Sequence, residues 1–295
     1  MDLKHLNISA DGSKLKAHSN SYGKKICKCQ SHNCECKRFY NAKDASLGYD
    51  SYRDCYVFGY NLYQLNSWSF DNKAELPAYM MMVTASRQDS ISGMYACQRA
   101  IKTMGYHVDN GCFDGAHDAT DFYIMARIWG MNPFIPLNTT NEGNVKNLPM
   151  SGMTEDGVPI CQAGHQMYYC GYSKDRDRLK WRCPIKACKK NKSLTKALAC
   201  EHLDTCSSSD YGRVVYTHPK DNPRLYTPVA RGTQKWQDIY DHRTSAERVF
   251  KREKNDFDLC SFKTRSKERL LFYALLTAIA VHIDTWYRQD NTKSP

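Results

Sequence analysis

The sequence predicts a mixed α/β fold, with a sheet flanked by helices and interrupted by a long insertion. Alternating apolar residues in short runs, as in residues 6–10, are typical of strands. Apolar residues at helical spacing follow in residues 89–104 and 240–257. Between residues 141 and 237, Gly, Pro, Cys and basic residues break up both periodicities. That region is therefore predicted to be an inserted, largely β and Cys-rich part of the chain.

The composition is that of a soluble globular protein with a basic surface. The chain has 295 residues, of which 41% are hydrophobic and 25% are charged. Its 42 Lys and Arg against 31 Asp and Glu give a net charge of +11, which favours a polyanionic partner over a merely soluble basic protein. The charge is concentrated in residues 1–43 and residues 174–196.

The cysteine content and the N-terminus predict a reducing, cytoplasmic setting. There are 14 cysteines, and the chain opens with Met-Asp-Leu-Lys-His rather than with an apolar signal segment. Free thiols or thiolate-metal sites are therefore expected in place of disulfides. The longest apolar run, Leu270 to Ile283, is shorter than the roughly 20 residues that span a bilayer, so it is predicted as a buried terminal helix without a membrane partner.

Three strands are predicted in the first part of the chain. The first is residues 6–10, where Leu and Ile alternate with polar residues, and Asp11-Gly12 is expected to end it at a turn. A hairpin turn is the ordinary role of Asp-Gly. Residues 52–65 and 75–85 are rich in aromatic and branched side chains and are predicted as core strands.

A strand followed by a helix is predicted around Asp114. Residues 106–114 are predicted as a short buried strand that ends at Asp114, and the next residues are predicted to turn into a helix that reaches Trp129. The carboxyl ends of strands are where α/β sheets usually place ligand chemistry. A carboxylate that merely caps the helix is the alternative interpretation.

One predicted helix has two side-chain stripes. Tyr240, Arg243, Glu247 and Lys254 follow the order Y-x2-R-x3-E-x6-K, which places them within about 60° of arc on a helix. A second stripe beside it is apolar and is made of Ile239, Ala246, Phe250 and Phe257. One flank is therefore expected to dock on a core while the other holds a carboxylate between cations. A charged surface helix is the alternative.

The four-residue pattern resembles the Y-R-E-K signature of bacterial insertion-sequence transposases of the DDE type. Two more segments are similar to motifs of that family. Asp11 begins the sequence Asp-Gly-Ser-Lys, in which Ser13 replaces the usual Thr, and Asp114 lies in Phe-Asp-Gly-Ala. The resemblance implies an RNase H-like catalytic core in residues 1–140 and 238–290, with residues 141–237 as the insertion subdomain.

The resemblance also implies an activity. Asp11, Asp114 and Glu247 would bind two Mg²⁺ or Mn²⁺ ions and support DNA cleavage and strand transfer at transposon ends. The side chains that would hold DNA phosphates are Tyr240, Arg243 and Lys254. Asp44 and Asp50 are competitors for the first carboxylate, but the family pattern favours Asp11.

The same resemblance sets the expected partners and the alternatives. It implies double-stranded DNA, both transposon ends and target, a homodimer in the active complex, and the nucleoid of a bacterial cytoplasm. The family normally has an N-terminal DNA-binding region before the first catalytic strand, whereas ten residues precede Asp11. A truncated copy, a second reading frame or a separately encoded domain is therefore expected. The alternatives are a non-mobile DNA-binding protein with structural zinc and a nuclease that only hydrolyses.

Two groups of cysteines have spacings that would suit zinc. The first, near the N-terminus, is made of Cys27, Cys29, His32, Cys34 and Cys36. The second, in the insertion, combines Cys183 and Cys188 with Cys200 and either His202 or Cys206. Unliganded thiols are the alternative interpretation for both groups.

Overall fold

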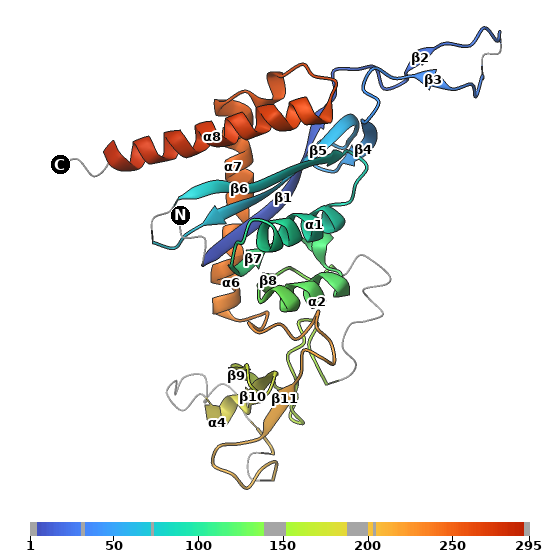
Figure 1. The fold of residues 1–295 in the computed structure, drawn as a ribbon. Coiled ribbons are helices and arrows are strands. Elements are labelled where there is room, and N and C mark those ends of the chain that lie inside the picture. Colours follow the sequence, from blue (N-terminus) through green and yellow to red (C-terminus); the bar gives the residue numbers. More distant parts are fainter. Residues whose placement is uncertain are drawn as a thin grey trace. The chain divides into compact units, whose positions relative to one another are not determined.

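The computed structural model describes residues 5–30, 33–71, 74–138, 152–187, 200–202 and 205–291. It divides into two compact units (Figure 1). The first unit contains Met1–His117 and His242–Pro295, and the second contains Asp118–Asp241. Each unit is described separately below.

A curled mixed sheet forms the centre of the first unit. Its strands are β1 (Leu6–Lys16), β4 (Ser46–Asp50), β5 (Cys55–Trp68), β6 (Glu75–Thr84) and β7 (Val108–Cys112). Strand β1 is central, because it pairs antiparallel with β5 on one edge and parallel with β7 on the other. The far edge of β5 pairs with β4 near its start and with β6 beyond that point. The predicted mixed α/β class is confirmed at this level.

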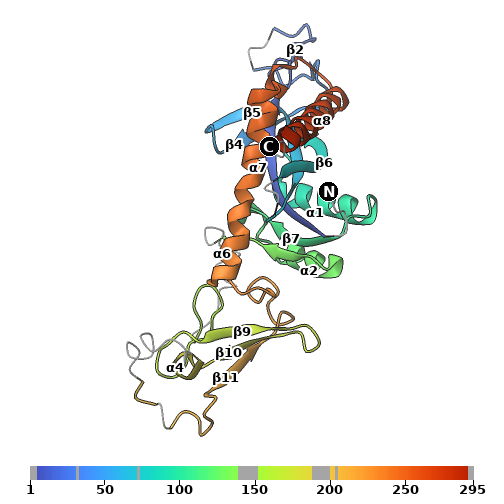
Figure 2. The ribbon, with the colours of Figure 1, turned by 90° about the vertical axis from the view of Figure 1, so that its left-hand side faces the viewer.

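Helices cover both faces of this sheet (Figures 1 and 2). Their bounds are α1 (Asp89–Lys102), η1 (Gly115–His117), η2 (Asp241–Arg243, which begins at the unit boundary), α7 (Thr244–Lys251), the π-helical turn η3 (Arg252–Asp256), η4 (Leu259–Ser261) and α8 (Lys267–Asn291). On one face α7 and α8 pack over an apolar core that includes Leu15, Leu62 and Phe250. Because side chains alternate along a strand, the odd residues of β1 and the even residues of β5 face this core.

The prediction that Asp11-Gly12 ends the first strand was wrong. Strand β1 continues through both residues to Lys16, because β5 is long enough to pair with it over that whole length. Gly12 serves close packing instead of a turn. A Cβ at this position would lie 2.4 Å from Asp89 Oδ1 and 2.9 Å from Asn61 Nδ2. A larger side chain would therefore have to displace these two side-chain ends, which are hydrogen-bonded to each other.

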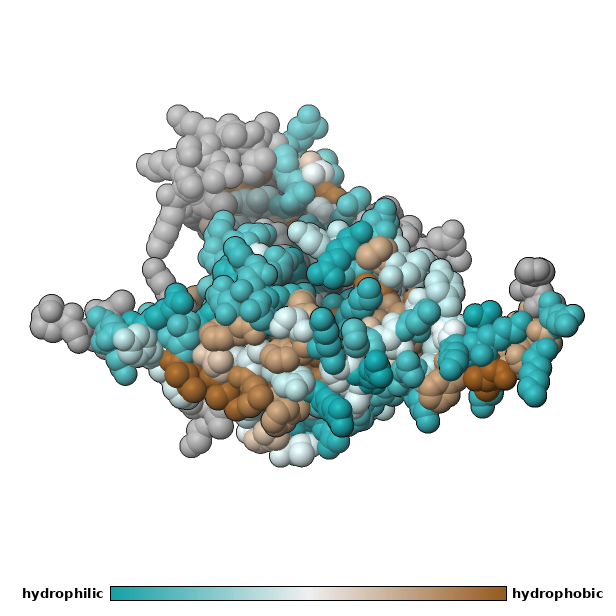
Figure 3. Space-filling view, turned by 90° about the horizontal axis from the view of Figure 1, so that it is seen from above, coloured by the Kyte–Doolittle hydropathy of each residue, from teal (hydrophilic) through white to brown (hydrophobic). Residues whose placement is uncertain are grey.

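The predicted buried terminal helix is present, but it is buried along one side only. Helix α8 has 25 residues, and it buries one side, which includes Leu270, Ala274 and Val281. Its other side exposes large apolar residues, namely Phe272, Leu275, Leu276, Ile279, Ile283, Trp286 and Tyr287. The face of the molecule that carries α8 accordingly shows apolar residues gathered together (Figure 3). By length and composition alone α8 could cross a membrane, and 28% of its most apolar window is buried.

The second unit combines helices with a small antiparallel sheet. Its elements are α2 (Thr120–Trp129), β8 (Asn132–Phe134), β9 (Tyr168–Ser173), β10 (Arg178–Arg182), α4 (Pro184–Ala187), β11 (Val214–Thr217) and α6 (Gln234–Tyr240). The strand order is β11-β10-β9, and the core beneath it includes Met167, Leu179 and Trp181. The predicted insertion, residues 141–237, lies within this unit, which also contains residues 118–140.

Candidate active site

A cleft in the first unit brings together groups that are far apart in the sequence. Its walls include the three predicted carboxylates, Asp11, Asp114 and Glu247. Arg243 and Lys254, two of the three residues predicted to hold phosphate, line the same cleft. Five of the six residues singled out by the sequence motifs therefore share one cavity wall.

Strand register places Asp11 beside Asp114. Strands β1 and β7 run parallel, and Ser9 is paired with Cys112. Asp11 follows Ser9 by two residues and Asp114 follows Cys112 by two residues, so the two carboxylates leave neighbouring strands at the same level. Asp114 lies just beyond the end of β7, and its charge raises the pKa of Asp11, as expected for neighbouring carboxylates.

The helical segment that carries Glu247 runs alongside this part of β1 (Figure 2). At one end the hydroxyl groups of Ser9 and Ser245 are in contact and both serines are fully buried. At the other end Lys254 donates a hydrogen bond to Ser13. The strand rises about 13 Å from Ser9 to Ser13, and the helical segment rises about 13 Å from Ser245 to Lys254. The two segments therefore stay side by side between these two contacts. Glu247 is thereby held on the same side of the sheet as Asp11.

Asp11 sits in an environment that resists ionisation. Burial raises the pKa of Asp11 to about 6, and the negative charges of Asp114 and Asp89 act in the same direction. The backbone N–H of Gly12, 2.8 Å from Asp11 Oδ1, and the Arg243 guanidinium partly oppose this rise in the pKa. A carboxylate that is desolvated next to other carboxylates is typical of a site that binds a cation.

Asp114 is oriented by a buried relay of two side chains. His117 Nδ1 lies 2.6 Å from Asp114 Oδ1, and His117 Nε2 lies 2.6 Å from the hydroxyl of Tyr63. Because an ionised carboxylate can only accept, Nδ1 donates to Asp114, while Nε2 shares a hydrogen bond with the Tyr63 hydroxyl. Burial alone would favour the neutral acid, but the hydrogen bond and charge of His117 hold the pKa of Asp114 below its ordinary value.

Gly93 on α1 makes room for this relay. A Cβ there would lie 2.6 Å from the Tyr63 hydroxyl oxygen and 2.9 Å from His117 Cδ2. Any larger side chain would displace the two groups that orient Asp114. Local sequence pattern does not reveal this, because Tyr63, Gly93 and His117 come from three separate elements.

Arg243 compensates the negative charge of the cleft. It forms an ion pair with Glu247 one turn later on the same helical segment, and its charge lowers the pKa of both Asp11 and Asp114. All three carboxylates belong to the described part of the chain. Their oxygens do not all lie within 4.8 Å of one another. Glu247 is 52% exposed at its side chain, so it is free to turn away from Arg243.

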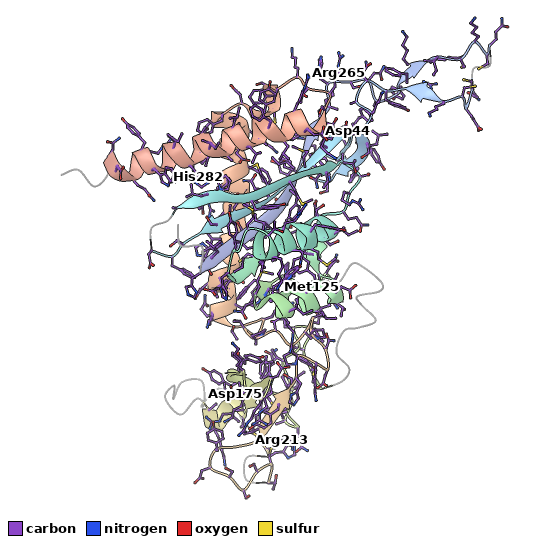
Figure 4. The ribbon with its side chains drawn as sticks, viewed as in Figure 1. Asp44, Met125, Asp175, Arg213, Arg265 and His282 are labelled. Atoms are coloured by element: carbon purple, nitrogen blue, oxygen red, sulfur yellow. The ribbon has the colours of Figure 1, made fainter. Side chains whose placement is uncertain are left out.

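The remaining candidates from the sequence have other places. Tyr240 belongs to the second unit, where its ring stacks on Trp236 with centroids 4.7 Å apart. Asp44 (Figure 4) accepts hydrogen bonds from Tyr60 and from the backbone N–H of Lys267, so it fastens the start of α8 to the sheet. Asp50 lines the cleft and accepts from two backbone N–H groups in the turn that follows it.

Sequence reasoning missed one of the five carboxylates that line the cleft. Asp89 begins α1, accepts a 2.6 Å hydrogen bond from Asn61 and raises the pKa of Asp11 by its charge. The signal that was available is the glycine at position 12, since its small size matters only if another group packs against it.

The N-terminal cysteine group forms a compact cluster. The sulfur atoms of Cys27, Cys29, Cys34 and Cys36 all lie within 4.8 Å of one another and could hold a metal ion such as zinc. His32, the fifth member of the predicted group, lies outside the described residues.

The cysteines of the insertion surround a small cavity in the second unit. Cys183, Cys200 and Cys206 line it together with Cys161, and the cavity holds about 20 Å³, enough for a single ion or water. His165 and His202 also line it. Cys188 lies outside the described residues, so the predicted ligand set is neither confirmed nor excluded. Cys161 is an additional candidate that the sequence spacing did not suggest.

We expect this insertion cavity to bind one zinc ion through its thiolates. Changing Cys161 or Cys183 to Ser should lower the zinc content of the purified protein by one equivalent per chain. The drop should be accompanied by a lower unfolding temperature, because metal binding stabilises the folded state. Elemental analysis of protein prepared without chelator measures this. Cys170, on β9 and outside the cavity lining, provides the matched control; equal zinc losses in Cys170→Ser and Cys183→Ser would contradict the assignment.

Comparisons with known proteins add no relative. No protein-family model matches the chain, and no curated protein is similar enough to count as a match. The candidate active site therefore rests on the sequence motifs and on the geometry described above.

Proposed function

We propose that this protein is the catalytic part of a DDE transposase, with an RNase H-like core, that cuts DNA and joins strands at transposon ends. The observation that carries the proposal is the arrangement of Asp11, Asp114 and Glu247 around one cleft that Arg243 and Lys254 also line. Three motifs separated by more than a hundred residues lead to this one place. If Glu247 lay on an ordinary surface helix and the two aspartates had only local roles, the three residues would not be expected to line the same cleft.

The donor set suits hard divalent cations. Carboxylate oxygens are the protein ligands that Mg²⁺ and Mn²⁺ prefer, and the cleft has one from each of β1, the β7 end and α7. When bound, two such ions would activate a water or 3′-hydroxyl for attack on a phosphodiester and stabilise the leaving oxygen. For metal to bind, Asp11 must lose its proton and Glu247 must leave Arg243.

The release of Glu247 from Arg243 would link metal binding to DNA binding. Once Glu247 turns toward a metal, the Arg243 guanidinium is released to grip two phosphate oxygens. Lys254 is fixed on Ser13, and burial lowers its pKa. The basic side chains of the cleft thus pair with groups of the protein in the free state and with DNA phosphates in the complex. The homodimer and the bacterial cytoplasmic setting stay predictions.

A cleavage and joining assay tests the proposal. Duplexes ending in the inverted repeats that flank the gene would be incubated with the protein in Mg²⁺, Mn²⁺ or chelator, with an upstream DNA-binding domain added if one is encoded nearby. Joined products would support a transposase. Cleavage without joining would assign a hydrolytic nuclease, and binding that needs no metal and leads to no cleavage would assign a regulatory DNA-binding protein.

Removing the His117 side chain should weaken this site without emptying it. His117→Ala leaves Asp114 without its orienting donor, and such changes typically cost about 10–100-fold in metal affinity or activity. The expected result is a higher Mg²⁺ concentration for half-maximal cleavage. His117→Asn, which restores a donor, should recover part of the loss, and the exposed His107→Ala should behave like wild type. A Mg²⁺ titration that His117→Ala leaves unchanged would show that the relay has no such role.

A further inference from the structure

A two-stranded hairpin stands out from the sheet of the first unit (Figure 1). Its strands, β2 (Lys24–Lys25) and β3 (Arg38–Phe39), have two residues each, and all four residues are exposed. Such a short hairpin is not stable in water by its own hydrogen bonds. Something besides backbone pairing must hold it, and the loop that it closes contains Cys27, Cys29, Cys34 and Cys36.

The positions of the four sulfur atoms match a tetrahedral thiolate site. The Sγ atom of Cys27 lies 3.3 Å from that of Cys29 and 3.4 Å from that of Cys34, and the Cys29 and Cys36 sulfurs are 3.8 Å apart. A zinc ion with Zn–S bonds of about 2.3 Å holds its four sulfurs about 3.8 Å apart. A disulfide would instead bring two sulfurs to about 2.05 Å, and all four cysteines are free.

We propose that Cys27, Cys29, Cys34 and Cys36 bind one zinc ion, and that this ion fixes the hairpin as an arm that contacts the DNA backbone. The second half of this proposal rests on the proposed function. The first half stands independently of it, on the sulfur positions. Four thiolates favour a soft or borderline cation such as Zn²⁺ over Mg²⁺, so this site is chemically distinct from the carboxylate cleft.

The arm carries the charge that a DNA contact needs. Residues 24–43 contain six Lys or Arg and one Glu, so the arm stays basic even after a net charge of about −2 for a zinc tetrathiolate is counted. Lys24, Lys25 and Arg38 lie on its paired strands. Arg38 also donates to the backbone oxygen of Tyr22, which ties it to the base of the arm.

Basic residues continue from the base of the arm toward the cleft. Lys16, Lys263 and Arg265 line a hollow at that base (Figure 4 labels Arg265). A second hollow there, which shares Lys16 with the first, has Arg53 and Leu47 in its wall. The same two residues also line the carboxylate cleft, so the two cavities adjoin. A duplex with one strand in the cleft therefore has a continuous basic path to the arm.

The zinc half is tested by metal content. Full-length protein purified under reducing conditions without chelator is compared with a Cys27→Ser/Cys34→Ser variant. The control is Cys55→Ser/Cys260→Ser, in which the two changed residues are exposed cysteines outside the cluster. We expect the first variant to lose one equivalent of zinc per chain and the control to lose none. Co²⁺ substitution should give a tetrathiolate spectrum whose loss follows the same pattern. Equal metal content in variant and wild type, or recovery of these cysteines as disulfides, would overturn the site.

The DNA half is tested by the salt dependence of duplex binding. Each phosphate contact contributes a slope of about −0.9 to log K against log salt. The Lys24→Gln/Lys25→Gln/Arg38→Gln variant should lose about two to three units of slope. A control with the same charge change on exposed residues elsewhere, Arg99→Gln/Lys102→Gln/Arg269→Gln, should lose less than one.

The Cys27→Ser/Cys34→Ser variant should bind duplex DNA several-fold more weakly at moderate salt, because an arm without zinc must be ordered on binding. Equal slopes for the arm variant and its control would overturn the DNA contact. The result is separable from the proposed function, because Asp11→Asn should keep both the zinc and the slope while losing cleavage. A protein that never cleaves DNA but shows the zinc and slope effects would refute only the proposed function.

Discussion

Changing Asp11 to Asn, Asp114 to Asn or Glu247 to Gln is expected to lower metal-dependent DNA cleavage by about 10³-fold or more in each case. Each substitution keeps the shape of the side chain and removes one negative charge from the cation site. Because the three groups act on the same ions, the loss of two should cost little more than the loss of one. The measurement is the initial rate of nicking of end-containing duplex in Mg²⁺ and in Mn²⁺.

Asp11→Asn should also have an opposite effect on stability, which makes the prediction for this residue sharper. Asp11 is desolvated and lies near other carboxylates, so its ionised form destabilises the metal-free protein above pH 6. Asp11→Asn should therefore raise the unfolding temperature in chelator at pH 8. Added Mg²⁺ should raise the unfolding temperature of wild type and not that of Asp11→Asn, since ligands stabilise only the state that binds them.

Three other aspartates serve as controls. Asp44→Asn should retain cleavage, because Asp44 is occupied in fastening Tyr60 and Lys267. Asp50 lines the cleft, but its carboxylate accepts a hydrogen bond from the turn that follows it. Asp50→Asn should therefore change the cleavage rate only a few-fold. Asp89→Asn removes the neighbour that raises the pKa of Asp11 and should shift the pH profile toward lower pH. Cleavage that survives Asp114→Asn, or that disappears with Asp44→Asn in a folded protein, would mean the site is assigned wrongly.

Replacing Glu253 with Gln is expected to stabilise the protein at neutral and alkaline pH. Glu253 lies in the π-helical turn η3 and is completely buried, and its Oε1 accepts a hydrogen bond from Gln64. Its Oε2 atom has no hydrogen-bond partner among the described residues. Burial raises the pKa of Glu253 to about 8, although the hydrogen bond from Gln64 and the charges of Lys254 and Arg252 oppose the rise.

The sign of the effect follows from this raised pKa. Below about pH 4.5 Glu253 is protonated in both the folded and the unfolded chain and costs nothing. Between pH 4.5 and pH 8 the unfolded chain releases the proton while the folded chain holds it, so the free energy of unfolding falls as pH rises. At about 1.4 kcal/mol per pKa unit, the loss at pH 8 is on the order of a few kcal/mol.

Urea unfolding of wild type and Glu253→Gln from pH 5 to pH 9 measures this difference. The gain from the substitution should be small at pH 5 and largest above pH 8. Glu268→Gln is the matched control, because Glu268 is exposed and its pKa is lowered by a hydrogen bond from Ser266. That variant should not gain stability with pH. A Glu253→Gln protein that is less stable than wild type at pH 8 would show that the ionised carboxylate is accommodated in the fold.

The chain by itself determined the local chemistry of this protein. Alternation in residues 6–10 predicts the strand that begins β1, and helical spacing assigns Arg243, Glu247 and Lys254 to one stripe. These inferences hold because the periods of strands and helices depend only on neighbouring residues. The presence of a sheet flanked by helices followed from the same periods and is confirmed.

Only the tertiary structure decided how these elements combine. Strand β1 runs past Asp11 because β5 supplies partners as far as Lys16, and no residue of β1 announces the length of β5. Asp89 and His117 enter the site through contacts across the sheet with Gly12 and Tyr63. Such contacts depend on register and packing between distant segments, and these are set when the whole core closes and not by any local pattern.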